Sequence, residues 1–195
     1  MEYRREVVLV RHGQTEWSAS GKHTGRTDIP LTEAGHANAD ALRPVLAGRE
    51  FIRKLTSPLQ RAAETCRLAG FGETAERRDE LMEWDYGDYE GLTTPEIRER
   101  RPGWYLWRDG CPGGEAAGDV GARVDRVVEE LRSLEGDAVL FAHGHLLRVL
   151  AARWIEHPPA FGGRLRLATG AVCTLGWERE VPAIELWNDT SHLAE

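Results

Sequence analysis

Residues 6–13, EVVLVRHG, decide the fold class of this chain. Residues 6–10 form a short apolar run rich in valine, a pattern typical of a buried strand. Arg11-His12-Gly13 follows directly and therefore lies at the carboxyl end of that strand. Ligands of open α/β sheets bind beyond the carboxyl ends of the strands. The stretch thus predicts a buried sheet and also the edge at which a site would form.

A second histidine stands in the same position later in the chain. Residues 137–142 predict another buried strand, and His143-Gly144 follows it. A helix is then expected from about residue 145 to residue 155. If the two strands are neighbours in the sheet, His12 and His143 project into one crevice.

The remaining pattern alternates strands with helices. Further strands are predicted at 51–56, 171–177 and 183–187, and helices at 32–46, 58–69 and 116–134. Ser57 is expected to cap the helix that begins with Pro58. This alternation favours a single-domain, three-layer α/β/α fold with a mostly parallel central sheet, spanning residues 1–195.

An irregular, aromatic segment interrupts this alternation between residues 72 and 115. It is long for a plain connection, and such segments often form lids or binding loops, so we expect a lid-like insertion here. Trp84, Trp104, Tyr105 and Trp107 lie in it. Two interpretations of these rings stay open: they wall a substrate pocket, or they belong to the structural core.

The composition excludes several classes of partner. The net charge is −7 and no block of basic residues occurs, which disfavours nucleic acid and anionic membranes. No apolar run approaches the ~20 residues of a transmembrane helix, and the N-terminus lacks a secretory signal. Cys66, Cys111 and Cys173 are odd in number and widely spaced, so we expect free thiols and a cytoplasmic location. The sequence leaves a homodimer open.

A small group of cationic side chains stands out within this acidic chain. Arg61 falls in the first turn of the helix after Ser57, where free backbone N–H groups favour phosphate. A guanidinium adds bidentate donors there. Together with Arg11, His12 and His143, it would form a compact pocket for a phosphate group. Neither histidine belongs to a paired-ligand motif and the arginines would repel a cation, so we expect no metal and no cofactor.

At this point the residues resemble a known family. Residues 9–17, LVRHGQTEW, resemble the signature of the histidine phosphatase superfamily, which includes the cofactor-dependent phosphoglycerate mutases. The resemblance continues in the family's order through residues 24–32, 57–62, 83–91, 113–115 and 143–145. It is closest to small bacterial acid-phosphatase-like members, and residues 14–31 also resemble the sedoheptulose-bisphosphatase branch. The resemblance implies a phosphoglycerate mutase-like α/β fold.

The resemblance also implies roles for particular residues. His12 would be the nucleophile, and Glu83 the proton donor. Arg11, Arg61 and His143 would bind the phosphoryl oxygens, with His143 protonated. Further substrate contacts are expected from a second set: Gln14, Ser18, Thr24, Gly25, Tyr86 and His145.

Two members of that second set are special. The family usually has Asn where this chain has Ser18, and the shorter serine puts the contact to phosphate in doubt. His145 matches a position whose backbone N–H can face the phosphate, while the role of its side chain is open. Glu90 and Glu115 are interpreted as structural hydrogen-bonding residues or surface charges.

Phosphoryl transfer requires positioning and charge neutralisation, which suits these residue types. His12 must be neutral at the attacking nitrogen, and we expect its other nitrogen to donate to a backbone carbonyl. Glu83 would start protonated and later, once ionised, activate water. These requirements predict an optimum on the acid side of neutrality and activity without a metal.

The sequence therefore predicts a phosphohydrolase that removes phosphate from a small phosphorylated metabolite, a phosphate ester, through a phosphohistidine. One alternative is a cofactor-dependent phosphoglycerate mutase, which usually carries an Arg where this chain has Trp84 and an insertion that this chain is too short to hold. Another is a non-catalytic member that binds phosphorylated ligands. Such a protein would be expected to lose His12 or Glu83, and both are present.

Overall fold

Strand β1 (Val7–Arg11) lies inside a six-stranded sheet in the computed structural model, which describes residues 5–193. Strand β4 (Ala138–Ala142) is its parallel neighbour, and the pairing runs along the whole of both strands. The residues that follow β1 and β4 therefore lie at the same edge of the sheet. This confirms the condition under which the two strand-end histidines would share one crevice.

The sheet has the order β3-β2-β4-β1-β5-β6. Strands β2 (Arg53–Thr56) and β3 (Glu76–Arg77) continue the parallel part beyond β4. Strands β5 (Val172–Glu178) and β6 (Val181–Asp189) form an antiparallel hairpin on the other side of β1. The predicted mostly parallel sheet is thus confirmed. The sequence analysis had missed the two-residue strand β3.

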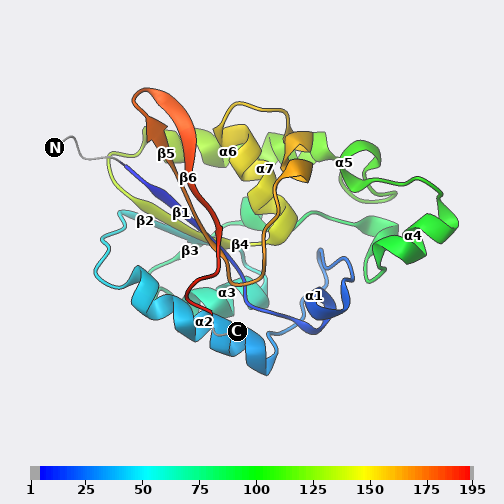
Figure 1. Ribbon diagram of the computed structural model, residues 1–195, viewed down its shortest axis with the longest axis horizontal. Coiled ribbons are helices and arrows are strands. Elements are labelled where there is room, and N and C mark those ends of the chain that lie inside the picture. Colours follow the sequence, from blue (N-terminus) through cyan, green and yellow to red (C-terminus); the bar gives the residue numbers. More distant parts are fainter. Residues whose placement is uncertain (1–4, 194–195) are drawn as a thin grey trace.

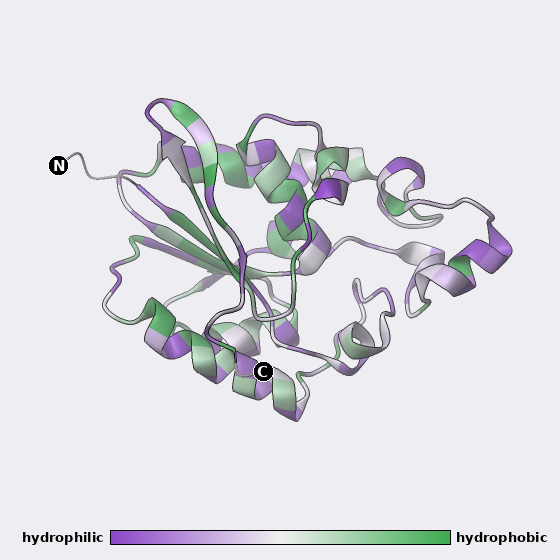
Figure 2. Cartoon of the chain, viewed as in Figure 1, coloured by the Kyte–Doolittle hydropathy of each residue, from purple (hydrophilic) through white to green (hydrophobic). Residues whose placement is uncertain are grey.

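Helices cover both faces of this sheet, which gives the predicted three layers (Figure 1). Helices α2 (Glu33–Leu46) and α3 (Gln60–Leu68) cover one face, and α6 (Ala117–Ser133) and α7 (Gly144–Trp154) cover the other. Successive residues of a strand point to opposite faces. Accordingly, Val8 and Val10 pack in the core beside α2 and α3, whereas Val7 and Leu9 pack beside α6 and α7. Figure 2 shows the apolar strands lying between the helices.

The start of α3 differs from the prediction. Its N-cap is Leu59 and the helix begins at Gln60, so Ser57 does not cap it. The Ser57 hydroxyl instead lies 2.7 Å from Nε2 of the buried His143. A buried imidazole needs a hydrogen-bond partner, and the same hydroxyl also accepts the N–H of Leu59, the N-cap residue, at 3.3 Å. Arg61 still falls in the first turn of α3.

The segment 72–115 extends to one side of the sheet, and α4 (Thr94–Arg100) and α5 (Leu106–Asp109) project there in Figure 1. It also contains two 3₁₀ turns, η1 (Asp79–Leu81) and η2 (Gly87–Tyr89). Trp84, Trp104 and Trp107 are buried in the core cluster that includes α6 and α7. The core interpretation of these three rings is therefore confirmed, whereas movement of this segment as a lid stays a prediction.

Two short elements complete the chain: α1 (Glu16–Ser20) and the 3₁₀ helix η3 (Pro159–Arg164). No helix within residues 5–193 is long and apolar enough to span a bilayer. The three cysteines are buried free thiols, as predicted. The expectation about a secretory signal concerns the N-terminus, and residues 1–4 lie outside the described part of the chain.

Candidate active site

His12 is buried just beyond the end of β1, with 4% of its surface exposed. Its Nδ1 lies 2.7 Å from the carbonyl oxygen of Gly13. A carbonyl only accepts, so Nδ1 carries the proton and Nε2 keeps its lone pair. This confirms the expected backbone partner. Nε2 itself makes no hydrogen bond to any residue between 5 and 193, and His12 lines the cavity described below.

A close approach of two backbone segments requires glycine next to this histidine. A Cβ atom on Gly13 would lie 2.2 Å from the carbonyl oxygen of Gly35 in α2. The backbone N–H of Gly13 also donates to the hydroxyl of Thr65 in α3. The turn after β1 is therefore held against both helices of that face, and this fixes the carbonyl that sets the His12 tautomer.

His143 lies beside His12, with 5.2 Å between the ring centroids. Arg61 Nε donates to His143 Nδ1 over 3.2 Å. Arginine has no acceptor, so Nδ1 must be unprotonated and the Nε2–H donates to Ser57. Burial lowers the pKa of His143 well below its usual value, and the charge of Arg61 lowers the pKa further. The expected protonated His143 is therefore wrong for this arrangement, in which the ring is neutral.

The two arginines approach the histidines from different elements. Arg61 is fully buried, and its guanidinium also donates to the backbone carbonyls of residues 24, 25 and 27. Arg11 donates through Nη1 to the carbonyl of Leu167 over 2.5 Å. Its guanidinium lies against Gly144, where a Cβ atom would come within 3.2 Å of Cζ. Its Nε is buried and has no acceptor among the described residues, so it is a free donor beside the two histidines.

Glu83 caps helix α7 although it comes from a distant segment. Its carboxylate accepts backbone N–H groups from Trp84 and Leu146 at 2.9 Å and from His145 at 3.1 Å. A helix N-terminus favours negative charge, and this helix has no side-chain cap of its own. The expectation that the His145 N–H faces phosphate is therefore wrong here, because that group donates to Glu83.

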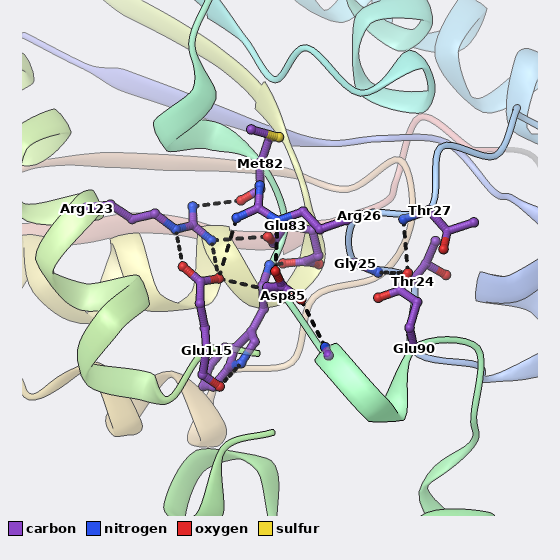
Figure 3. Close-up of polar contacts among 12 residues, drawn as sticks. Thr24, Gly25, Arg26, Thr27, Met82, Glu83, Asp85, Glu90, Glu115 and Arg123 are labelled. Carbon is purple, nitrogen blue, oxygen red and sulfur yellow. Dashed lines mark hydrogen bonds and ion pairs between the residues drawn. The ribbon is translucent and has the colours of Figure 1, made fainter. Parts of the chain in front are cut away.

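Arg123, on α6, holds the segment that carries Glu83 in place (Figure 3). Arg123 donates to the carbonyls of Glu80 and Met82 at 2.7 Å and of Glu83 at 3.1 Å. It also pairs with the Glu115 carboxylate at 2.8 Å. Glu115 is thus a structural hydrogen-bonding residue, as predicted, whereas the sequence analysis had missed Arg123. The pair fixes the backbone of the expected proton donor.

A second carboxylate holds the loop that binds Arg61. Glu90 accepts the backbone N–H groups of Gly25 at 2.8 Å and Thr27 at 3.1 Å (Figure 3). A Cβ atom on Gly25 would lie 2.5 Å from the carbonyl oxygen of Trp84, so only glycine fits there. Gly25 therefore packs beneath the site and presents its carbonyl to Arg61. The predicted contact between Gly25 and substrate is not supported.

One cavity of about 270 Å³ joins most of these groups. Of the predicted site residues, it is lined by Arg11, His12, Ser18, Thr24, Glu83, Tyr86 and His145. His143 and Arg61 do not line it: both are fully buried, with the His143 ring beside that of His12 and Arg61 hydrogen-bonded to His143. Gln14 is not part of the lining, because its side chain accepts a hydrogen bond from Thr32, the N-cap residue of α2. Sequence reasoning had missed four other lining residues with polar or charged side chains: Lys22, His23, Thr94 and Arg148.

Two predicted substrate contacts already have partners in the protein. The Ser18 hydroxyl donates to the carbonyl of Thr15 at 2.9 Å and accepts its N–H at 2.9 Å, as part of the capping of α1. The Tyr86 hydroxyl lies 2.5 Å from His145 Nδ1. Burial lowers the pKa of the His145 ring well below its usual value. The His145 side chain thus orients Tyr86 on the cavity wall.

The buried histidines make folding stability depend on pH. Burial lowers the pKa of His12 and of His143 well below 6.5, and Arg61 lowers both further. As the pH falls through 6.5, the unfolded chain takes up protons at both rings while the folded chain does not. The free energy of unfolding should therefore decrease below pH 6.5, by up to about 1.4 kcal/mol per pH unit for each ring.

Urea unfolding at pH 7.5 and pH 5.5 measures this effect. We expect a lower midpoint at pH 5.5, and a smaller difference between the two conditions for His12→Gln, which removes one of the three rings whose pKa lies well below 6.5. His157 is exposed, so His157→Gln serves as the matched control and should behave as the wild type does. Equal wild-type midpoints at the two pH values would contradict the assignment of neutral, buried imidazoles.

Two histidines and two arginines at the carboxyl edge of a mostly parallel sheet define an α/β protein with a site for an oxyanion such as phosphate. Comparison with known sequences makes the class specific. The chain belongs to the histidine phosphatase superfamily (branch 1), whose sequence profile matches residues 7–190.

Similar proteins cover nearly the whole chain. An acid phosphatase of Mycobacterium tuberculosis is 39% identical over 190 residues, which is 95% of this chain and 93% of the relative. A sedoheptulose 1,7-bisphosphatase of Saccharomyces cerevisiae is 40% identical over 181 residues, covering 75% of this chain and 66% of the relative. A 2,3-bisphosphoglycerate-dependent phosphoglycerate mutase of Mesorhizobium japonicum is 40% identical over 166 residues, covering 75% and 79%.

Solved structures share the fold over the same length. A Mycobacterium tuberculosis protein superimposes with a TM-score of 0.89 at 36% identity, covering 94% of this chain and 97% of its own. A mycobacterial glucosyl-3-phosphoglycerate phosphatase, solved in complex with VO3, gives a TM-score of 0.84 at 31% identity, covering 95% and 100%. The phosphoglycerate mutase-like fold expected from the sequence is confirmed.

Proposed function

We propose that the protein is a phosphomonoester hydrolase that acts on a small phosphorylated metabolite through a phosphohistidine on His12. The observation that carries the proposal is the state of the His12 ring. Its Nδ1–H is bound to the carbonyl of Gly13, so the lone pair of Nε2 is available in a cavity that Glu83 also lines. A neutral imidazole fixed in one tautomer is what in-line attack on phosphorus requires.

In the first step His12 Nε2 attacks phosphorus and the ester P–O bond breaks. Glu83, in its acid form, gives its proton to the leaving oxygen, so the product departs as an alcohol. Arg11, whose Nε has no acceptor among residues 5–193, and Arg61 would donate to the phosphoryl oxygens. His143 lies beside His12 and would hold the Arg61 guanidinium in place, because its Nδ1 accepts from Arg61 and its Nε2–H donates to Ser57. Losing one such donor typically costs ~10²–10³ in rate.

In the second step the Glu83 carboxylate takes a proton from water, and that water attacks the phosphohistidine. The P–N bond breaks, inorganic phosphate leaves, and Glu83 is again protonated. Burial holds the pKa of His12 well below its usual value, so the nucleophile stays neutral in mildly acidic solution. This supports the expected optimum on the acid side of neutrality.

The named relatives support hydrolysis of a small metabolite. Three of them carry the names acid phosphatase, sedoheptulose 1,7-bisphosphatase and glucosyl-3-phosphoglycerate phosphatase. A cavity of about 270 Å³ is also at the small end of metabolite sites, which typically measure ~300–1,000 Å³. Both features favour a free phosphate ester over a phosphorylated protein.

A mutase is the second candidate, because relatives with about the same identity are named phosphoglycerate mutases. Trp84 argues against it. Mutases usually carry an arginine after the proton donor, whereas this tryptophan is buried and donates through Nε1 to the carbonyl of Glu115 at 2.8 Å. No cation can contact a substrate carboxylate from that position.

Incubation with 3-phosphoglycerate in EDTA separates the two candidates. We expect inorganic phosphate to be released in proportion to the 3-phosphoglycerate consumed, with no accumulation of 2-phosphoglycerate. A wider set of sugar and glycerol phosphates then tests the hydrolase on other esters. Interconversion of the two phosphoglycerates without net release of phosphate would support the mutase, and no turnover of any ester would remove the enzymatic proposal.

A further inference from the structure

Arg148 places a further cation on the wall of the cavity, in addition to Arg11. It lies on α7, five residues beyond His143, and it lines the same cavity as His12 and Glu83. At 1.5 Å of rise per residue, its Cα lies about 7.5 Å further along the helix axis than that of His143. The sequence analysis assigned it no role, and the proposed mechanism does not use it.

The guanidinium of Arg148 is held rigidly and has unused donors. It lies 4.7 Å from the ring centre of Trp107, and its Nε donates to the carbonyl of Gly162 at 2.9 Å. A Cβ atom on Gly162 would lie 2.7 Å from the Trp107 ring, so a glycine is needed for the backbone of η3 to pack against this ring. Within residues 5–193, no carboxylate lies within ion-pair distance of Arg148, and its two Nη groups have no acceptor.

The charges around the cavity exceed what one phosphate group requires. Three cations line it, Arg11, Lys22 and Arg148, against the single carboxylate of Glu83. Glu83 is itself bound by three backbone N–H groups of the protein. Arg11 belongs to the cluster around His12, together with the buried Arg61. Within residues 5–193, neither Arg148 nor the exposed Lys22 forms an ion pair, and Glu83 acts on the charge of Arg148 only from beyond ion-pair distance.

Leaving a guanidinium in a partly buried position without an anion is unfavourable, and burial indeed lowers the pKa of Arg148. A planar, pre-positioned guanidinium matches carboxylate and phosphate groups through paired hydrogen bonds. We infer that Arg148 binds a second anionic group of the substrate, so that the preferred substrates are small phosphate esters that also carry a carboxylate or a second phosphate. This inference rests on the proposed phosphatase activity and specifies its substrate class.

Matched substrates test the inference. 3-Phosphoglycerate and glycerol 3-phosphate differ in a carboxylate against a hydroxymethyl group, and fructose 1,6-bisphosphate and fructose 1-phosphate differ in the second phosphate. The selectivity is the ratio of two kcat/KM values: that for the substrate with the second anionic group, divided by that for the matched substrate that lacks it. We expect the wild type to prefer the substrate with the second anion by at least about tenfold in one of the two pairs, and that pair identifies the group that is bound.

Arg148→Met removes the charge but keeps an unbranched stem against Trp107. It should lower the selectivity at least about tenfold, whereas Arg148→Lys should retain part of it. Arg132 provides the matched control, because it also lies over a tryptophan ring, Trp154, at 5.5 Å and does not line the cavity. Arg132→Met should leave the selectivity unchanged.

Two results would overturn the inference. In one, the wild type hydrolyses both members of each pair equally well. In the other, Arg148→Met lowers kcat/KM by the same factor for the substrates with and without the second anionic group, which a merely structural role would produce. Both results require hydrolysis by the wild type, so they are distinct from failure of the proposed function, in which no ester releases phosphate.

Discussion

Replacing His12 with alanine is expected to lower kcat for phosphate release by at least about 10⁴-fold. The substitution removes the atom that forms the P–N bond, and therefore removes the pathway and not just one stabilising contact. The cationic side chains around it remain, so phosphate esters should still bind. KM should thus change far less than kcat, which distinguishes loss of a nucleophile from collapse of the pocket.

The measurement has two parts. Steady-state release of nitrophenol from p-nitrophenyl phosphate gives the loss in rate, and rapid quenching with labelled substrate reports the covalent intermediate. The wild type should carry label that is stable in base and released in acid, and His12→Ala should carry none. His157→Ala, at an exposed histidine, is the control for the general effect of losing an imidazole. Label at full level on folded His12→Ala would place the nucleophile elsewhere.

The central part of the site could be predicted because it is written in local sequence pattern. A valine-rich run followed by Arg11-His12-Gly13, and a second run followed by His143, place both rings at strand ends. Parallel pairing of β1 and β4 then brings the ends together without any contribution from loops. The position of Arg61 was predicted for a similar reason, since Pro58 marks the start of a helix within about two residues.

The errors have a different physical origin. Gln14, Gly25 and the N–H of His145 were expected to contact substrate, but each is used by the protein: by Thr32, by Arg61 and by Glu83. Such competition between partners depends on three-dimensional neighbours that no local pattern records. The protonation of His143 was misjudged in the same way, because the donor that faces its Nδ1 is 82 residues away in the chain.

The residues that were missed shape the outer part of the cavity. His23 and Lys22 come from the turn after α1, where sequence periodicity is absent, so their direction could not be predicted. Arg148 lies on a helix that was predicted, and its position one to two turns after His143 was a usable signal. When a histidine at a strand end is followed directly by a helix, an arginine in the first two turns of that helix is a candidate for substrate binding.

Glu83→Gln is expected to separate the two halves of the reaction. General acid–base catalysis is typically worth ~10²–10⁴ in rate, so turnover of an alkyl ester such as glycerol 3-phosphate should fall by about 10³-fold. p-Nitrophenol is a good leaving group and needs little help from an acid. His12 should therefore still be phosphorylated by p-nitrophenyl phosphate, while attack of water on the phosphohistidine should be slow.

The expected signature is a burst of nitrophenol equal to the enzyme concentration, followed by a slow steady phase. The amide can replace the carboxylate only in part: one oxygen can still accept from Trp84 and Leu146, but the NH₂ group then faces the N–H of His145. That clash should cost about 1–3 kcal/mol of stability, so thermal unfolding is measured alongside the kinetics.

Glu16→Gln, at an exposed glutamate in the first turn of α1, is the matched control and should show neither the burst nor the loss of stability. Equal losses of Glu83→Gln on the alkyl and aryl esters, with no burst, would mean that this carboxylate does not transfer a proton. Glu83 would then act only as the cap of α7, and the proton donor would have to be sought among the other groups on the cavity wall, with Tyr86 the first to test.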